Sequence, residues 1–410
     1  MAKERIIGEY RVDNIQSLMN HASKLRGTTL REWGVDEDYV VGGKGRFGQT
    51  LESAYFRIDN NPRREADFEE IGVELKTTPL RKSGNALVAK ERMVLGIINF
   101  NTLLDEGWEG SFFDKNCKLL IVFYLHEPKK SFLDYIIKDA ILWDFPGDDL
   151  WIIKNDWNKI AGMVRDGKAH EISERHTVYL KACVKGAGHG RDYRTQPFSD
   201  EPAHQRAFSL GNRYVTMMWD RRKEARERFD RAFDPGGFDY ERSFEENVLQ
   251  RFMPFVGMKT RNIEDRILET PYSKNKKDRY AALARKMLGV DTAKVEEFEI
   301  AEIKMKTVRL SKKGKMREHM SFRHFKYEEF LGKWKDSVPF DEFDKKFLFV
   351  IYKEDGQGDL RLHNVFFWEM PQSDLDAIES VWNRTRDLVL GGEYDNLPRI
   401  VEHHITHVRP

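Results

Sequence analysis

The sequence has little of three things that would restrict its class: cysteine, long apolar runs and net charge. Only two of its 410 residues are cysteines, Cys117 and Cys183, which argues against a disulfide framework and fits a reducing cytoplasm. No run of 18 apolar residues occurs and the N-terminus has no signal-peptide core, so we expect no membrane association. The 69 Lys and Arg nearly balance the 68 Asp and Glu, which excludes a general polycation but allows local basic patches.

The chain is long enough for two domains, and its 40% hydrophobic residues are sufficient for real cores. Apolar runs rich in Val, Ile and Phe predict buried strands, and apolar residues at helical spacing predict amphipathic helices. We expect strands at Glu91–Phe100, Lys118–Leu125 and 175–185, and helices at Gln49–Phe56 and around Trp157. The order of these elements predicts a mixed α/β domain.

The most informative stretch is Ala66–Leu80, ADFEEIGVELKTTPL. A strand over Ile71–Thr78 places alternate side chains on opposite faces, so Glu74 and Lys76 share one face. Asp67 lies seven residues before Glu74. This is the Asp-(x)n-Glu-x-Lys pattern of metal-dependent nucleases. Two carboxylates can hold a hard cation such as Mg2+, and the cation and the lysine together can act on a phosphodiester.

Spacing alone leaves other interpretations open, since Glu-x-Lys is common on solvated strand faces. Glu52, at the margin of an apolar helix face, is either a surface residue or a third carboxylate beside the strand. Gly43–Gly48 reads GxGxxG, the glycine pattern of dinucleotide sites. Such a site needs an acid that closes the following strand, whereas Asp67 precedes it. We therefore expect no nucleotide site at these glycines.

The second half of the chain resembles an altered copy of the first. Leu75–Leu80, LKTTPL, is echoed by Met305–Leu310, MKTVRL. Trp157 and the asparagine after it are echoed by Trp382 and its own asparagine. Because the matches keep the same order and nearly the same offset in numbering, duplication explains them better than chance.

The copy is chemically different at the acidic strand. On the register of these matches Lys304 replaces Glu74, and a lysine cannot ligate a divalent cation at neutral pH. A shifted register, in which Glu302 and Lys304 form a new Glu-x-Lys, stays open from the sequence. The segment also gathers positive charges suited to phosphates. These residues are Lys304, Lys306, Arg309, Lys312, Lys313, Lys315 and Arg317.

These features divide the chain into three parts. We expect residues 1–220 to form a catalytic domain, 221–240 a charged helix and linker, and 241–410 a degenerate DNA-binding or regulatory domain. At the offset that relates Trp157 to Trp382, the counterpart of Lys185 would be position 410, so the second copy is expected to lack its last strands.

The first half resembles MutH, the mismatch-repair endonuclease, and the GATC-cutting type II restriction endonucleases related to it. The likeness covers about residues 15–220 and is strongest in the GVELKT core. It implies a restriction-endonuclease-like mixed sheet flanked by helices, present as two tandem MutH-like copies. It also implies Mg2+-dependent double-strand cuts in DNA at a short site, GATC. The other matching segments are Lys44-Gly45, Leu51-Glu52, Asp156-Trp157 and Arg175-His176.

The resemblance also assigns roles to individual residues. It implies that Asp67 and Glu74 are the acidic metal ligands and that Lys76 is the catalytic strand lysine. It adds Glu52 as a helix carboxylate, which could complete the metal shell or hold Lys76. It adds Lys115 as a further active-site lysine.

Double-stranded DNA is the implied partner. The resemblance places DNA contacts at Lys44, Lys185 and Tyr214. The recognition loop, Arg-Pro-Lys in MutH, is Cys183-Val184-Lys185 here, so the lysine is kept and the two residues before it are not. Related two-domain enzymes carry a degenerate second copy that binds a second DNA site. One active centre per chain further implies that a double-strand cut needs two chains or two successive events, and we expect a transient dimer on DNA.

Three other functions compete with this hypothesis. A mismatch-repair nicking endonuclease is disfavoured by the second copy, because MutH is a single domain. A non-catalytic DNA-binding protein is disfavoured by the intact acidic pair and lysine. A metalloprotease fits poorly, because His170 and His176 miss the HExxH spacing.

Overall fold

The chain folds into two compact units, Met1–Arg228 (unit 1) and Phe229–Pro410 (unit 2). Both are mixed α/β structures, as predicted. The part of the chain that the structure describes holds no helix long and apolar enough to cross a membrane. The computed structural model describes residues 6–7, 10–37, 45–58, 65–186, 192–222, 233, 237–273, 276, 278–291, 295–318, 320, 322, 326–399 and 405–406.

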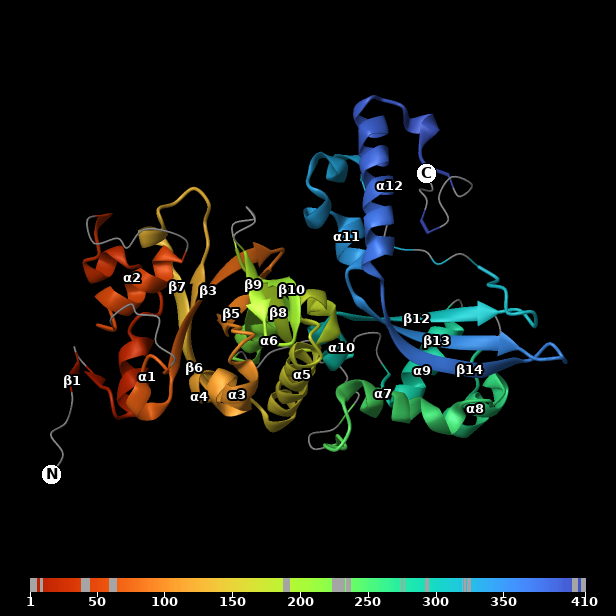
Figure 1. The fold of residues 1–410 in the computed structure, drawn as a ribbon, viewed down its shortest axis with the longest axis horizontal. Coiled ribbons are helices and arrows are strands. Elements are labelled where there is room, and N and C mark those ends of the chain that lie inside the picture. The colour runs from red at the N-terminus through yellow and green to blue at the C-terminus, as the bar shows by residue number, and fades with distance from the viewer. Residues whose placement is uncertain are drawn as a thin grey trace. The chain divides into compact units, whose positions relative to one another are not determined.

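Unit 1 is built on a four-stranded sheet of order β4-β3-β6-β7, with β3 parallel to β6 and the other pairs antiparallel (Figure 1). The central strand β6 has a continuous apolar sequence, LLIVF, buried on both faces, which is typical of a covered strand. The strands are β3 (Glu74–Ser83), β4 (Ala86–Ala89), β6 (Lys118–Leu125) and β7 (Ile137–Asp144).

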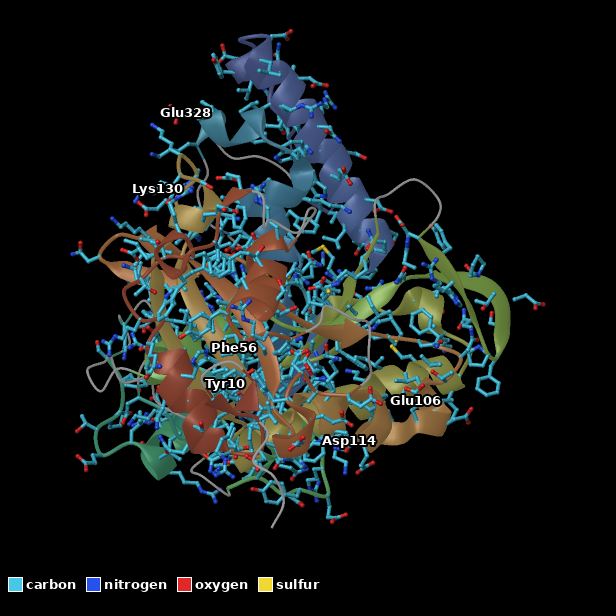
Figure 2. All side chains as sticks on the ribbon, turned by 90° about the vertical axis from the view of Figure 1, so that its left-hand side faces the viewer. Tyr10, Phe56, Glu106, Asp114, Lys130 and Glu328 are labelled. Atoms are coloured by element: carbon cyan, nitrogen blue, oxygen red, sulfur yellow. The ribbon has the colours of Figure 1, made fainter. Side chains whose placement is uncertain are left out.

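One face of this sheet packs against the N-terminal helices. Leu75 of β3 and Val122 of β6 share an apolar core with Leu18 and Leu51, which lie on helices α1 and α2. Figure 2 labels Tyr10, whose hydroxyl donates to the carbonyl of Phe56 at 2.6 Å, tying strand β2 to the end of α2. The elements are β1 (Ile6–Ile7), β2 (Tyr10–Arg11), α1 (Ile15–Ser23) and α2 (Arg46–Ala54).

A second, antiparallel sheet of order β5-β11-β8 and a separate hairpin, β9–β10, complete the strands of unit 1. The remaining helices of unit 1 connect and cover the two sheets. The strands are β5 (Met93–Ile97), β8 (Leu180–Val184), β9 (Tyr193–Gln196), β10 (Ser199–His204) and β11 (Arg206–Leu210). The helices are α3 (Leu103–Trp108), α4 (Asp114–Asn116), α5 (Gly147–Arg165) and α6 (Asn212–Arg221).

The described residues of unit 2 form a sheet of order β12-β13-β14, with helices α7, α8 and α9 along one side of it (Figure 1). Helix α12 packs through Trp382 onto Phe330 and Trp334. The strands are β12 (Ile303–Leu310), β13 (Lys346–Glu354) and β14 (Leu360–Glu369). The helices are α7 (Phe244–Phe252), α8 (Thr260–Ile267), α9 (Arg279–Leu288), α10 (Glu296–Ala301), α11 (Val338–Phe343) and α12 (Gln372–Leu390).

The two units repeat one topology. In each, a first strand pairs parallel with a second, the second pairs antiparallel with a third, and a helix of 19 residues follows. The set is β3, β6, β7 and α5 in unit 1, and β12, β13, β14 and α12 in unit 2. Both long helices begin after a proline, Pro146 and Pro371. The resemblance seen in the sequence is therefore also a resemblance of strand order and direction.

Strand pairing decides the register of the repeat. Glu74 pairs with the second residue of β6, Leu119, and Lys304 pairs with the second residue of β13, Phe347. The residues two positions earlier, Gly72 and Glu302, both take the left-handed conformation, with φ of 61° and 58°. Glu302 thus lies in the turn before β12, so the shifted register, in which it would stand on the strand, is excluded.

Several predicted boundaries need correction. The strand predicted from Ile71 begins at Glu74, because Glu69–Ile71 form a 3-10 turn that ends in the left-handed Gly72. The strand predicted at 175–185 begins only at Leu180, after another 3-10 turn. The helix predicted from Gln49 begins three residues earlier, at Arg46. Most of the linker predicted at 221–240 lies outside the described residues.

Candidate active site

A tight turn brings the two predicted metal ligands together. The turn is closed by the backbone hydrogen bonds of an isolated bridge between Phe68 and Val73, at 2.9 and 3.3 Å. The backbone N–H of Asp67 then donates to Oε2 of Glu74 at 3.2 Å, and Oδ2 of Asp67 accepts from the N–H of Leu75 at 2.9 Å. Asp67 therefore lies beside Glu74 because the chain folds back before the strand begins.

Two ammonium groups surround the carboxylate of Glu74, whose side chain is only 3% exposed. Nζ of Lys76 lies 2.6 Å from Oε1 of Glu74, and Nζ of Lys115 lies 3.6 Å from the same oxygen. Lys115 also donates to the carbonyl of Glu65 at 3.2 Å. A buried carboxylate is costly unless it is paired, and these two lysines supply the compensating charge.

Helix α2 supplies a third carboxylate. Gly48 lets the helix approach β3 closely, since a Cβ at this position would lie 2.9 Å from Oγ1 of Thr77. Glu52, one turn further along α2, then lies within electrostatic range of Asp67, Glu74 and Lys76. The glycine that ends the GxGxxG pattern thus serves helix–strand packing.

The electrostatics are those of crowded acids. Burial raises the pKa of Glu52 to about 7, and the negative charge of Asp67 adds to the effect. Burial also raises the pKa of Asp67 to about 6, and the charge of Glu74 adds to it. Three carboxylates against two ammonium groups leave one net negative charge when all are ionised. A bound cation would relieve the repulsion that raises both pKa values.

The donors suit a hard divalent cation, because carboxylate oxygens are the ligands that Mg2+ prefers. The carboxylate of Asp67 accepts a hydrogen bond from the N–H of Leu75, and that of Glu74 accepts from the N–H of Asp67 and from Lys76. These few donors leave carboxylate oxygen lone pairs for a cation. Among the residues that the structure describes, no group of three or more His, Cys, Asp or Glu side chains is arranged to hold a metal ion. Asp67 and Glu74 are the candidate ligands, and Glu52 is within electrostatic range of both.

The comparisons with known proteins include the segment that carries these side chains. The family model described as "DNA mismatch repair enzyme MutH" matches residues 56–156, which include Asp67, Glu74, Lys76 and Lys115. The chain is 32% identical to the type II restriction enzyme Sau3AI of Staphylococcus aureus over 388 residues, covering 90% of the chain and 79% of that enzyme. The chain belongs to the type II restriction endonucleases related to MutH. It is a site-specific deoxyribonuclease with a restriction-endonuclease-like fold.

MutH proteins match a smaller part of the chain. The MutH of Buchnera aphidicola is 29% identical over 176 residues, covering 42% of the chain and 79% of that protein. The MutH of Shewanella woodyi is 27% identical over 183 residues, covering 42% of the chain and 76% of that protein. The match to the restriction enzyme thus extends over both units, whereas the MutH matches account for less than half of the chain.

The predicted DNA contacts of this endonuclease have different outcomes. Lys185 follows strand β8, and its N–H donates to the carbonyl of Gln205 at 2.7 Å, which fixes the end of the strand beside β11. Lys44 lies outside the described residues. Tyr214 is 1% exposed and its hydroxyl donates to Oδ2 of Asp149 at 2.7 Å. The prediction that Tyr214 contacts DNA is wrong for this structure, because helix α6 turns it into the core.

Sequence reasoning missed a carboxylate that positions the start of strand β8. Asp156 on helix α5 is buried and accepts the backbone N–H groups of Val178, Tyr179 and Leu180, at 2.7, 2.6 and 2.9 Å. These bonds hold the start of β8, which ends just before Lys185. The pair Asp156-Trp157 stood out in the sequence, but the hydrogen-bond partners of Asp156 lie far along the chain and give no local signal.

Sequence reasoning also missed the buried arginine Arg206, which lies beside the end of strand β8. It is buried at the start of β11, opposite Val184, and its Nη1 donates to the carbonyl of Ala182 at 2.7 Å. Its Nε is buried with no hydrogen-bond partner within the described part of the chain. Burial lowers the pKa of this guanidinium. Its place in an antiparallel sheet, far in sequence from β8, could not be read from residue spacing.

Proposed function

We propose that unit 1 hydrolyses a DNA phosphodiester with Mg2+ and makes double-strand cuts at GATC. The observation that carries the proposal is the contact of Glu74 with both Asp67 and Lys76. It places Asp67 beside the carboxylate of Glu74 and an ammonium group against the same carboxylate, at the first residues of strand β3. The 32% identity to a type II restriction enzyme supports a site-specific double-strand cutter over a non-catalytic DNA-binding protein.

The residues divide the work by charge. A bound divalent cation would supply Lewis-acid chemistry at the scissile phosphate. Asp67 and Glu74 would hold it, and Glu52 would either add an oxygen ligand or balance the charge of Lys76. Lys76 would orient the attacking water and stabilise the extra negative charge of the pentavalent phosphate. Lys115, whose Nζ lies 3.6 Å from the same oxygen of Glu74 that Lys76 contacts, would help to hold that carboxylate.

Base recognition is proposed for the end of strand β8. Lys185 would donate to the acceptors of guanine in the major groove. Its position is fixed by the backbone bond to Gln205 and, through β8, by Asp156. The missing Arg and Pro of the MutH loop leave Lys185 as the retained reader of the site.

Unit 2 is proposed to bind DNA as an effector without cutting it, because Lys304 stands where unit 1 has Glu74. One catalytic centre per chain then requires two chains, or two successive events, for a double-strand cut. We propose a transient dimer on DNA. The alternative, a nicking enzyme, is favoured only by the MutH relatives, which match 42% of the chain.

The experiment is a plasmid digest with Mg2+, followed by run-off sequencing of the fragments. The proposal predicts double-strand ends at GATC and no product in EDTA. Nicked circles as the only product would support the nicking alternative, and no cleavage with Mg2+ would contradict the proposal. Sedimentation of the protein with a short duplex, in Ca2+ to prevent cleavage, tests the transient dimer.

A further inference from the structure

The place in unit 2 that corresponds to the active site has a different set of charges. Lys304 and Lys306 lie two residues apart on one face of β12, as Glu74 and Lys76 do on β3. Nζ of Lys306 also lies 4.6 Å from the centre of the Phe322 ring. The strand thus presents two ammonium groups where unit 1 presents a carboxylate and an ammonium.

In both units a strand residue forms an ion pair with a residue of the helix that precedes the next strand, but the two charges are exchanged. In unit 1 the carboxylate of Glu74 on the strand faces Lys115, three residues before the first residue of β6. In unit 2 the ammonium of Lys304 on the strand faces the carboxylate of Glu342, four residues before the first residue of β13. The contact between strand and preceding helix is kept while its two charges are exchanged.

The exchange leaves these three corresponding groups with one net positive charge in each unit, and the unit 1 site is negative because Asp67 and Glu52 add two further carboxylates. The unit 1 site has one net negative charge when its groups are ionised, and so attracts a cation. Lys304, Lys306 and Glu342 together carry one net positive charge. Burial lowers the pKa of Lys306, and the charge of Glu342 opposes that shift. A half-buried positive site favours an anion with several acceptor oxygens.

We propose that Lys304 and Lys306 bind a DNA backbone phosphate directly, with their ammonium groups in the place of the divalent cation used by unit 1. This rests on the proposed effector role of unit 2 and names its contact. Glu342 competes with the phosphate for Lys304, so it limits the affinity. Binding of DNA at unit 2 therefore needs no metal ion.

The experiment measures binding of a short GATC duplex to the full chain in EDTA, by fluorescence anisotropy. The Glu74→Gln background prevents cleavage when Mg2+ is added. We expect two duplexes per chain, and we expect Lys304→Gln and Lys306→Gln each to weaken the second binding event about tenfold. The slope of log K against log salt for that event falls by about one for each variant.

Two further variants separate phosphate binding from a structural role. Lys304→Arg keeps the charge and the ion pair, and should bind as the parent chain does. Glu342→Gln removes the competing carboxylate and should tighten the second event, an effect that mere loss of a structural ion pair would not produce. Thermal melting confirms that each variant is folded. Lys333→Gln, at an exposed lysine of unit 2, is the matched control.

The outcomes distinguish this inference from the proposed function. A second event that needs Mg2+, or that is unchanged in Lys304→Gln and Lys306→Gln, overturns the inference while the effector role stands. Absence of any second event overturns both the inference and the effector role. Cleavage of plasmid by the wild-type chain is scored separately, and its loss contradicts the proposed activity of unit 1 alone.

Discussion

The two units of this endonuclease share a strand topology and differ in the charged side chains of the corresponding strands β3 and β12. β3 and β12 occupy the same position, and both follow a left-handed turn residue, Gly72 or Glu302. Replacing Glu74 by Lys304 reverses the charge at the strand, and the neighbouring helix carries the complementary charge in each case. Each unit thus has an ion pair between the strand and the helix before the next strand, with the carboxylate on the strand in unit 1 and on the helix in unit 2.

A second difference concerns the segment that leads into strand β8. Asp156 precedes Trp157 on α5, and on the same alignment Val381 precedes Trp382 on α12. Asp156 accepts three backbone N–H groups of the segment leading into β8, whereas Val381 has no polar group to offer. Unit 2 has the corresponding tryptophan, Trp382, but no carboxylate at the position of Asp156.

The largest predicted effect is at the metal ligands. Glu74→Gln removes the charge of a ligand and leaves two lysines without their carboxylate, so plasmid cleavage in Mg2+ should fall by about 10³-fold or more. Gel electrophoresis of the digest measures it. Glu69→Gln, at an exposed acid on the preceding turn, should cut as the wild type does. Cleavage by Glu74→Gln at the wild-type rate would show that the Glu74 carboxylate, which unit 2 lacks at Lys304, is not needed for cutting.

Lys76→Ala should have the next largest effect, about 10²- to 10³-fold on the single-turnover rate, because an ammonium group at the phosphate stabilises the transition state. DNA affinity should change little, since base and backbone contacts elsewhere remain. Rapid-quench cleavage and anisotropy measure the two quantities. A loss confined to affinity would mean that Lys76 acts like Lys306, as a binding group.

Asp156→Asn tests the second difference between the units, the hydrogen bonds of Asp156 to the start of β8. The amide oxygen cannot replace a charged acceptor of three N–H groups, so we expect unfolding to cost about 1–3 kcal/mol less. Differential scanning calorimetry measures the stability, and cleavage of sites with one altered base measures the specificity. Asp166→Asn, at an exposed residue after the same helix, is the control. Unchanged stability and specificity would show that the three hydrogen bonds do not position β8.

The smallest effect concerns pH. The folded pKa of Glu52, about 7, is higher than its ordinary value near 4.5, so the folded state holds the proton more tightly. Stability without metal should therefore fall as pH rises from about 4.5 to 7, by an amount of order 1 kcal/mol after solvent screening. Glu52→Gln should flatten this fall in thermal melts in EDTA. An equally steep fall in the variant would assign the pH dependence to other groups.

Local patterns predicted much of the fold. The apolar run of β6 and the helical spacing around Trp157 are properties of neighbouring residues, so the sequence alone located them. The start of β3 was missed, because the left-handed Gly72 turns the chain where alternation would continue a strand. The predicted register of the repeat is confirmed by strand pairing at Lys304.

Features that depend on contacts between distant segments were harder to predict from the sequence. The grouping of Asp67 with Glu74 and Lys76 followed from their closeness in sequence and the resemblance to MutH. The prediction that Tyr214 contacts DNA was wrong, because the sequence around it does not show which face of helix α6 packs into the core. Asp156 and its partners were invisible to pattern analysis for the same reason. Their contacts join segments that are far apart in the sequence.

The central claim is that the divalent cation binds in unit 1, between the carboxylates of Asp67 and Glu74. Titration of the full chain with Mn2+, followed by electron paramagnetic resonance in the presence of a GATC duplex, tests it most directly. The account predicts a bound ion in the wild-type complex and its release in the Asp67→Asn, Glu74→Gln double variant. Undiminished Mn2+ binding by that folded double variant would contradict it.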